Sequence, residues 1–157
     1  MKKILISTLF LIFISGAFQL TFGQAKGFGL GVVLGEPTGI SFKSWTSPHG
    51  AFDGGVAWSV SNYYNKSGYL HLHADYLVHN FKLVDVNQGQ LPFYLGLGAK
   101  VVFANDPVFG ARIPLGMNYI FGDVPLDLFA EIVPGLNFIP STDFSLEGGI
   151  GIRYWFR

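Results

Sequence analysis

The chain has 157 residues, of which 50% are hydrophobic and 13% charged, with 21 glycines, no cysteine and a formal net charge of zero. Since average proteins carry about 25% charged residues, this chain is poor in charge, which argues against disorder, and its length suits one domain. The lack of cysteine excludes disulfides, thiolate zinc sites and cysteine nucleophiles, and the balanced charge argues against a nucleic-acid-binding surface.

The N-terminus has the pattern of a secretory signal peptide. Two lysines precede an apolar stretch over residues 4–18, and small residues up to Gly23 fit the positions before a cleavage site. The stretch is shorter than the roughly 20 residues that a membrane-spanning helix needs. We therefore expect a signal peptide over residues 1–23, cleavage between Gly23 and Gln24, and one mature domain over residues 24–157.

The rest of the chain alternates between large apolar residues and small or polar ones, without a sustained helical period. Turn-forming segments such as residues 47–50 separate the alternating stretches. The fourth stretch either ends near residue 79 or continues to residue 86 through a bulge. The pattern predicts eight strands, over about residues 26–35, 39–43, 52–60, 70–79, 93–103, 109–119, 126–135 and 144–156.

The two faces of these strands differ in side-chain size. One face carries aliphatic and aromatic residues, and the other carries glycine, alanine and serine with a few charges, without the lysine and glutamate coat of a soluble surface. Small residues suit the interior of a narrow barrel, and large apolar residues suit a face in contact with lipid. We therefore expect an all-β fold, an eight-stranded antiparallel up-and-down transmembrane β-barrel. Six aromatic residues near strand ends are candidates for membrane-interface girdles: Trp45, Trp58, Tyr69, Tyr119, Tyr154 and Trp155.

Two other classes of function remain open at this point. A secreted, soluble, lipocalin-like barrel that binds an apolar ligand would place the large residues inside. A membrane-embedded enzyme would need a nucleophile and a base, for which Ser59, Ser61, His71 and Asp75 are the available residues. No nucleophile motif surrounds either serine, so we expect no enzymatic activity.

The C-terminal strand resembles the closing strand of Gram-negative outer-membrane barrels, which alternates apolar residues and ends in phenylalanine. In this chain the stretch runs from Glu147 to Phe156. The resemblance implies that Tyr154 and Phe156 belong to a signal that the barrel assembly machinery reads.

Three further motifs, Arg112-Ile113-Pro114-Leu115-Gly116, Phe129-Ala130-Glu131-Ile132-Val133-Pro134 and Pro140-Ser141-Thr142, resemble a family of small uncharacterised outer-membrane barrels of OmpA or OmpX type. That resemblance implies no catalytic residues and no cofactor. We expect a monomer in the cell outer membrane, in contact with its lipids, with a structural, adhesive or minor-channel role.

Four charged residues share the predicted inward face: Lys100, Arg112, Glu131 and Glu147. Turns centred near Asp106 and Gly122 place Lys100 roughly opposite Arg112, and Arg112 close to Val133. Because buried charges persist only when they are paired, we expect these two cations and two carboxylates to meet inside the barrel. Such a network either plugs the lumen or gates a small pore.

One group of residues has the chemistry of a metal site. His71, His73 and Asp75 alternate along one strand face, and a further ligand would have to come from His79 or Asp53. Hydrogen-bonded polar residues in a wet lumen explain the pattern equally well, so we expect no metal.

Overall fold

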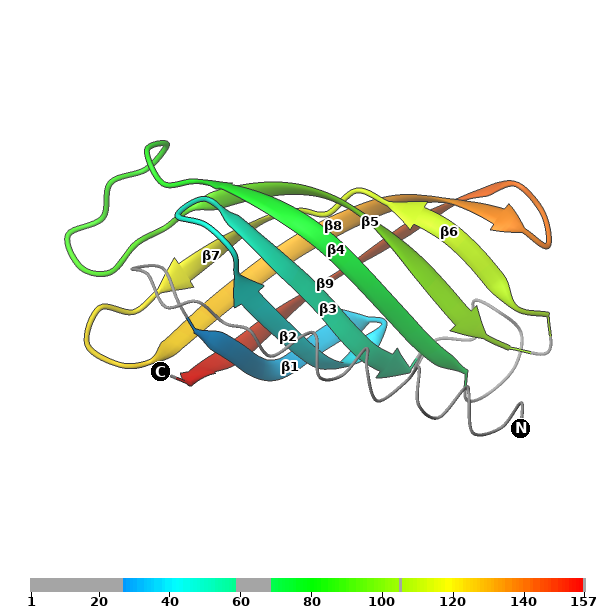
Figure 1. Cartoon of the computed structure of the whole chain (residues 1–157), viewed down its shortest axis with the longest axis horizontal. Coiled ribbons are helices and arrows are strands. Elements are labelled where there is room, and N and C mark those ends of the chain that lie inside the picture. The colour runs from blue at the N-terminus through cyan, green and yellow to red at the C-terminus, as the bar shows by residue number, and fades with distance from the viewer. Residues whose placement is uncertain (1–26, 59–68, 105, 157) are drawn as a thin grey trace, which may run out of the picture.

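The computed structural model describes residues 27–58, 69–104 and 106–156, which form one antiparallel sheet (Figure 1). The predicted signal peptide and its cleavage site lie outside these residues. Among the described residues, no helix is long and apolar enough to cross a membrane. The strands are β1 (Phe28–Glu36), β2 (Thr38–Trp45), β3 (Gly50–Trp58), β4 (Leu70–Asn80), β5 (Phe93–Phe103), β6 (Val108–Arg112), β7 (Leu115–Ile120), β8 (Leu126–Ile139) and β9 (Asp143–Phe156).

The sheet closes into a barrel because its first and last strands pair. β1 pairs with β9 over its whole length, and β4 pairs with β5 on the opposite side of the barrel. Every pairing is antiparallel and joins strands that follow one another along the chain, apart from the closing pair and the two strands β6 and β7. The up-and-down antiparallel barrel expected from the sequence is therefore confirmed.

The strands β6 and β7 together occupy one position in the barrel. Both pair with β5 on one side and with β8 on the other, and Ile113 and Pro114 separate them. Proline has no N–H for the ladder, yet the Pro114 carbonyl accepts a hydrogen bond from the Gly96 N–H at 2.8 Å, and the Ile113 N–H donates to the Pro134 carbonyl at 2.9 Å. The nine strands thus make an eight-stranded barrel, as expected, although the predicted strand over residues 109–119 is interrupted.

The barrel has two ends with different connections. At the end where β1 begins and β9 finishes, the connections are residues 46–49, 81–92 and 121–125. At the other end, residue 37 connects β1 to β2 and residues 140–142 connect β8 to β9; the links from β3 to β4 and from β5 to β6 at this end include residues outside the described ranges. β4 ends at Asn80, so the continuation to residue 86 is wrong, and residues 81–92 form a connection instead.

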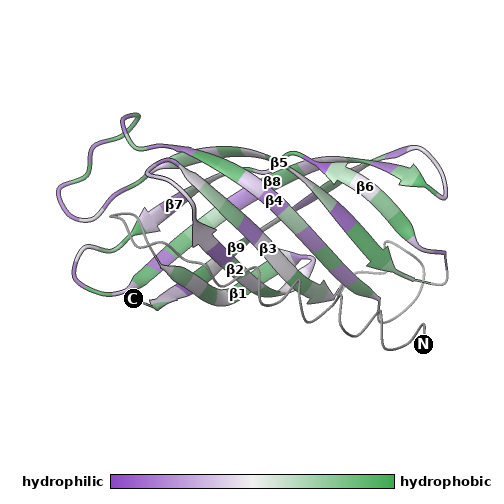
Figure 2. Cartoon of the chain, in the orientation of Figure 1, coloured by the Kyte–Doolittle hydropathy of each residue, from purple (hydrophilic) through white to green (hydrophobic). Residues whose placement is uncertain are grey.

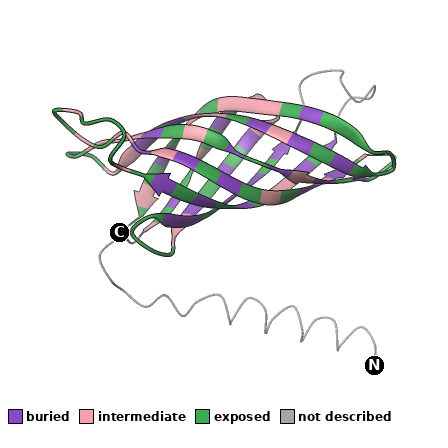
Figure 3. Cartoon of the chain, turned by 90° about the horizontal axis from the view of Figure 1, so that it is seen from above, coloured by how far each residue is buried: buried purple, intermediate pink, exposed green. Residues whose placement is uncertain are grey.

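Burial alternates residue by residue along the strands (Figure 3), and it inverts the usual relation between burial and polarity. Large apolar side chains such as Leu97 and Ile150 are 65% and 64% exposed on the outer face. Arg153 and Lys100, in contrast, are buried inside. Hydrophobic and hydrophilic residues alternate accordingly along the ribbon (Figure 2). A soluble barrel that binds an apolar ligand needs the opposite arrangement, with apolar residues inside and charges outside.

Candidate functional site: the charged lumen

The first group of lumen charges surrounds Arg112 and is called the Arg112 cluster; it contains Asp75, Lys100, Arg112, Glu131 and Glu147. The guanidinium of Arg112 lies 3.1 Å from Asp75 Oδ2, 3.2 Å from Glu147 Oε2 and 3.9 Å from Glu131 Oε1. Lys100 pairs with the other oxygen of Glu147. The four residues singled out in the sequence are therefore brought together, and Asp75 joins them.

The backbone registers within this cluster differ from those expected. Arg112 lies opposite Gly98 on β5 and Gly135 on β8, two residues away from the expected Lys100 and Val133. The turn between β5 and β6 is centred one residue earlier than Asp106, and the turn between β7 and β8 is centred between Asp123 and Val124 instead of near Gly122. The long side chains of lysine and arginine span this difference, so the charges still meet.

Neighbouring polar groups complete the hydrogen bonding of the Arg112 cluster. Lys100 Nζ donates to Ser145 Oγ at 2.9 Å, and the Tyr94 hydroxyl donates to Glu131 Oε2 at 2.8 Å. His71 Nε2 lies 4.0 Å from Glu147 Oε2. Side chains from β4, β5, β6, β8 and β9 thus converge on one cluster, which links strands on opposite sides of the barrel.

A second group of charges, the Arg153 cluster, contains Lys43, Asp53, Asp127 and Arg153. Arg153 is 1% exposed, and it lies 2.5 Å from Asp53 Oδ1 and 3.2 Å from Asp127 Oδ1. Its guanidinium also lies 3.9 Å from the ring centre of Phe129, at cation–π distance. Arg153 therefore joins β3 to β8 and β9 through the lumen.

Lys43 is held in the same region by polar and aromatic partners. Its Nζ lies 2.7 Å from Nε2 of His79, and it donates to Asn118 Oδ1 at 3.3 Å. Asn118 in turn donates to Asp127 Oδ2 at 2.8 Å. Lys43 Nζ also lies 5.1 Å from the ring centre of Trp45 and 5.0 Å from that of Tyr94.

The sequence analysis did not identify the Arg153 cluster, although a signal was present. Alternate residues of each strand point into the barrel, and we call these positions the inward parity of the strand. The four charged residues of the cluster all have the inward parity of their strands: Lys43, Asp53, Asp127 and Arg153. Parity alone would have put them in the lumen, but which of them meet depends on the barrel's closure, since β1 separates β2 from β9 in the sheet.

Both ends of the described lumen carry large apolar side chains. Tyr69, Val102 and Val108 form a buried hydrophobic cluster near the end where β5 and β6 connect. At the opposite end the ring centre of Trp45 lies 6.2 Å from that of Trp155 and 4.4 Å from that of His79. These residues flank the two charged clusters along the barrel axis.

This placement corrects the expected interface girdles. Tyr69 is buried, and Trp45 and Trp155 share the inward parity of Lys43 and Arg153, so these three rings belong to the lumen. Trp58 and Tyr154 lie on the outer face, with 47% and 48% exposure.

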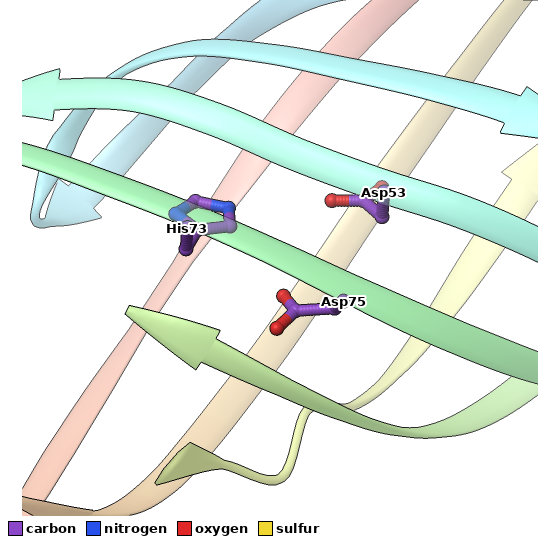
Figure 4. A group of neighbouring side chains, drawn as sticks. All are labelled: Asp53, His73 and Asp75. Carbon is purple, nitrogen blue, oxygen red and sulfur yellow. The ribbon is translucent and has the colours of Figure 1, made fainter. Parts of the chain in front are cut away.

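A potential metal-binding group lies between the two clusters (Figure 4), and it differs from the set considered in the sequence. Asp53, His73 and Asp75 each offer one ligand atom, and these atoms lie within 4.8 Å of one another. His71 is directed toward Glu147 and His79 contacts Lys43, so neither belongs to the group. Asp53, considered earlier as an additional ligand, takes the place of His71.

The residues considered for an enzymatic site have other contacts. Asp75 pairs with Arg112, and His71 lies beside Glu147. Ser59 and Ser61 lie outside the described residues. His71 and Asp75 are thus both part of the charged network of the described lumen.

Comparison with known proteins gives one structural likeness. No family model matches the chain, and no curated protein matches it. Among solved structures, the chain is similar to the N-terminal β-barrel domain of Pseudomonas aeruginosa OprF, with a TM-score of 0.61 and 11% sequence identity. The match covers 83% of this chain and 96% of that domain. At this identity the likeness shows a shared small β-barrel fold.

Proposed function

We propose that the mature chain is an integral outer-membrane β-barrel whose lumen is closed by two ion-paired clusters, so that it serves as a membrane-anchored structural or adhesive protein. The observation that carries this proposal is the inverted polarity of the barrel. Its outer face is apolar on every strand, while Lys43, Lys100, Arg112 and Arg153 are buried inside. In a bilayer the apolar face contacts lipid, and barrel closure leaves no strand edge unpaired.

The contacts inside the lumen favour a closed barrel and argue against a minor channel. The Arg112 and Arg153 clusters contribute side chains from both sides of the wall, and apolar residues lie beyond them toward either end. A water-filled pore would need these ion pairs to separate, which would leave buried charges without partners.

The outer-membrane location rests on two further features. A signal pattern at residues 1–23 directs export, and the strand β9 ends with Tyr154 and Phe156, both on the outer face. These aromatic residues form the C-terminal signal for the barrel assembly machinery. The other partners are the membrane lipids, and the barrel is monomeric, since closure satisfies all strand edges without a second copy.

A matched pair of substitutions tests the membrane assignment. Leu97 lies in the middle of β5 and Leu83 in the connection 81–92, yet their exposed fractions are nearly equal at 65% and 62%. In lipid vesicles, Leu97→Arg is expected to reduce the free energy of unfolding by about 2–4 kcal/mol, whereas Leu83→Arg should change it by about 0–1 kcal/mol. The measurement is urea unfolding of both variants in the same vesicles. Equal effects at the two positions would contradict a bilayer around the barrel.

Cell fractionation provides the second test. The wild-type protein is expected to stay with the outer membrane after a carbonate wash and to show heat-modifiable mobility in gels. Recovery in the soluble fraction would contradict the proposal.

A further inference from the structure

The junction between the two charged clusters brings two carboxylates together. Asp53 and Asp75 are directly opposite each other on β3 and β4, both side chains point inward, and both are buried. Like charges at directly opposed positions destabilise a sheet. Arg153 contacts Oδ1 of Asp53 and Arg112 contacts Oδ2 of Asp75, so each carboxylate has one cationic partner.

Buried polar atoms around this junction lack a hydrogen-bond partner within the described residues. They include Oδ1 of Asp75 and Nδ1 of His73, and also Nε of Arg112 and Nη2 of Arg153 in the two arginines that face the carboxylates. Asp75 itself is only 3% exposed. Leaving a buried acceptor unsatisfied is costly, so natural proteins rarely do so without a ligand, water or ion. In Figure 4 the carboxylates of Asp53 and Asp75 point toward the ring of His73.

The barrel wall makes room for these side chains with glycine at the facing positions. Gly55 lies opposite His73, and a Cβ added there would lie 2.5 Å from Cε1 of the imidazole. Gly98 lies opposite Asp75, and a Cβ there would overlap Oδ1 of the carboxylate. Any larger residue at either position would displace the side chain that faces it.

The charges of the two clusters do not balance. Lys43, Lys100, Arg112 and Arg153 contribute four positive charges, whereas Asp53, Asp75, Asp127, Glu131 and Glu147 contribute five negative ones. With all five carboxylates ionised and the histidines neutral, the two clusters carry one excess negative charge. A cation bound between Asp53 and Asp75 would offset that excess.

From these observations we propose that Asp53, His73 and Asp75 bind a divalent transition-metal ion of the Zn²⁺ type in the lumen. One imidazole nitrogen with carboxylate oxygens is a donor set that Zn²⁺ accepts, whereas Mg²⁺ and Ca²⁺ favour oxygen ligands alone.

The geometry requires only a small closure of the three side chains. Ligand distances of about 2.0–2.2 Å in a tetrahedral site place donor atoms about 3.3–3.6 Å apart. The three donors already lie within 4.8 Å of one another, so movements of about 1 Å bring them to an ion. The ion would then connect the Arg112 cluster to the Arg153 cluster, and this role holds whether or not a bilayer surrounds the barrel.

The test is Zn²⁺ binding to the refolded mature chain in detergent, after chelator treatment, measured by calorimetry. We expect one Zn²⁺ per chain and a urea midpoint that rises with Zn²⁺, because a ligand that binds only the folded state stabilises it. His73→Gln should weaken binding at least tenfold and abolish the shift of the urea midpoint. His71→Gln is the matched control, since this neighbouring lumen histidine lies outside the site, and its affinity should stay within twofold of the wild type.

Two further measurements make the result independent of any one variant. Gly55→Ala keeps all three ligands but displaces the His73 ring, so it too should weaken binding. X-ray absorption of the wild-type Zn²⁺ complex should show one imidazole nitrogen and oxygen ligands. An absence of saturable binding, an equal loss in His71→Gln and His73→Gln, or an all-oxygen shell would overturn the proposal.

Discussion

Removing Arg153 provides a direct test of the ion-paired lumen. This guanidinium lies 2.5 Å from Asp53 and 3.2 Å from Asp127, and it is 1% exposed. Two unit charges 3.2 Å apart attract by about 5 kcal/mol at an effective dielectric constant of about 20. Desolvation of both charges offsets much of that attraction in the intact pair. When one partner is removed, the desolvated carboxylates remain without compensation, so Arg153→Met is expected to cost about 3–5 kcal/mol.

A double-mutant cycle separates this charge effect from lost packing. Asp127→Asn keeps the shape of the side chain and removes one of the two stranded charges. The double variant Arg153→Met with Asp127→Asn should therefore be more stable than the sum of the single changes implies, by about 1–3 kcal/mol. Part of the loss should remain, because Asp53 still lacks its arginine.

The assay is urea unfolding in lipid vesicles, followed by tryptophan fluorescence. Trp45 and Trp155 lie close together beside the Arg153 cluster, so their emission reports on this part of the lumen. Lys82→Met is the control, since it removes the same charge from an exposed position and should change stability by less than about 0.5 kcal/mol. A loss below about 1 kcal/mol for Arg153→Met, or strictly additive changes in the cycle, would refute the reasoning.

Two other predictions concern conductance and processing. In planar bilayers both the wild type and Glu147→Gln should show negligible conductance. The variant removes one carboxylate from the Arg112 cluster, but the Arg153 cluster and the apolar residues at both ends of the lumen stay in place. Frequent channel openings in the variant would instead identify the network as a gate. The intact mass of the protein extracted from membranes should correspond to a chain that begins at Gln24, and a mass that includes residues 1–23 would contradict cleavage there.

The sequence was sufficient to predict the eight strands and the direction of most side chains, because strand parity is a local property. Alternate residues of any strand point to opposite faces, so Lys100, Arg112, Glu131 and Glu147 could be assigned to the lumen without knowledge of the fold. The choice of the small-residue face as the inner one followed from side-chain volume, since a narrow barrel has little interior space. Neither inference requires a contact between distant residues.

The tertiary structure decided which lumen residues meet. The turn between β5 and β6 and the turn between β7 and β8 are centred at other positions than expected, and this displaced Arg112 by two residues from its expected partners on β5 and β8. Closure of β1 onto β9 brought Arg153 within reach of Asp53, which is 100 residues away in the chain. It also placed Trp45 beside Trp155 inside the lumen, where the sequence alone had indicated a membrane interface.

The same distinction applies to the proposed metal site. Periodicity put His71, His73 and Asp75 on one strand face, but one strand cannot surround an ion. The register of β3 against β4 placed Asp53 opposite Asp75, while Glu147 from β9 lies beside His71. The face of a strand to which each side chain points follows from the backbone geometry of that strand, so the alternation of residue types in the sequence predicts it. Register depends on the lengths of turns, bulges and the closing pair, and these are set only when the whole barrel has formed.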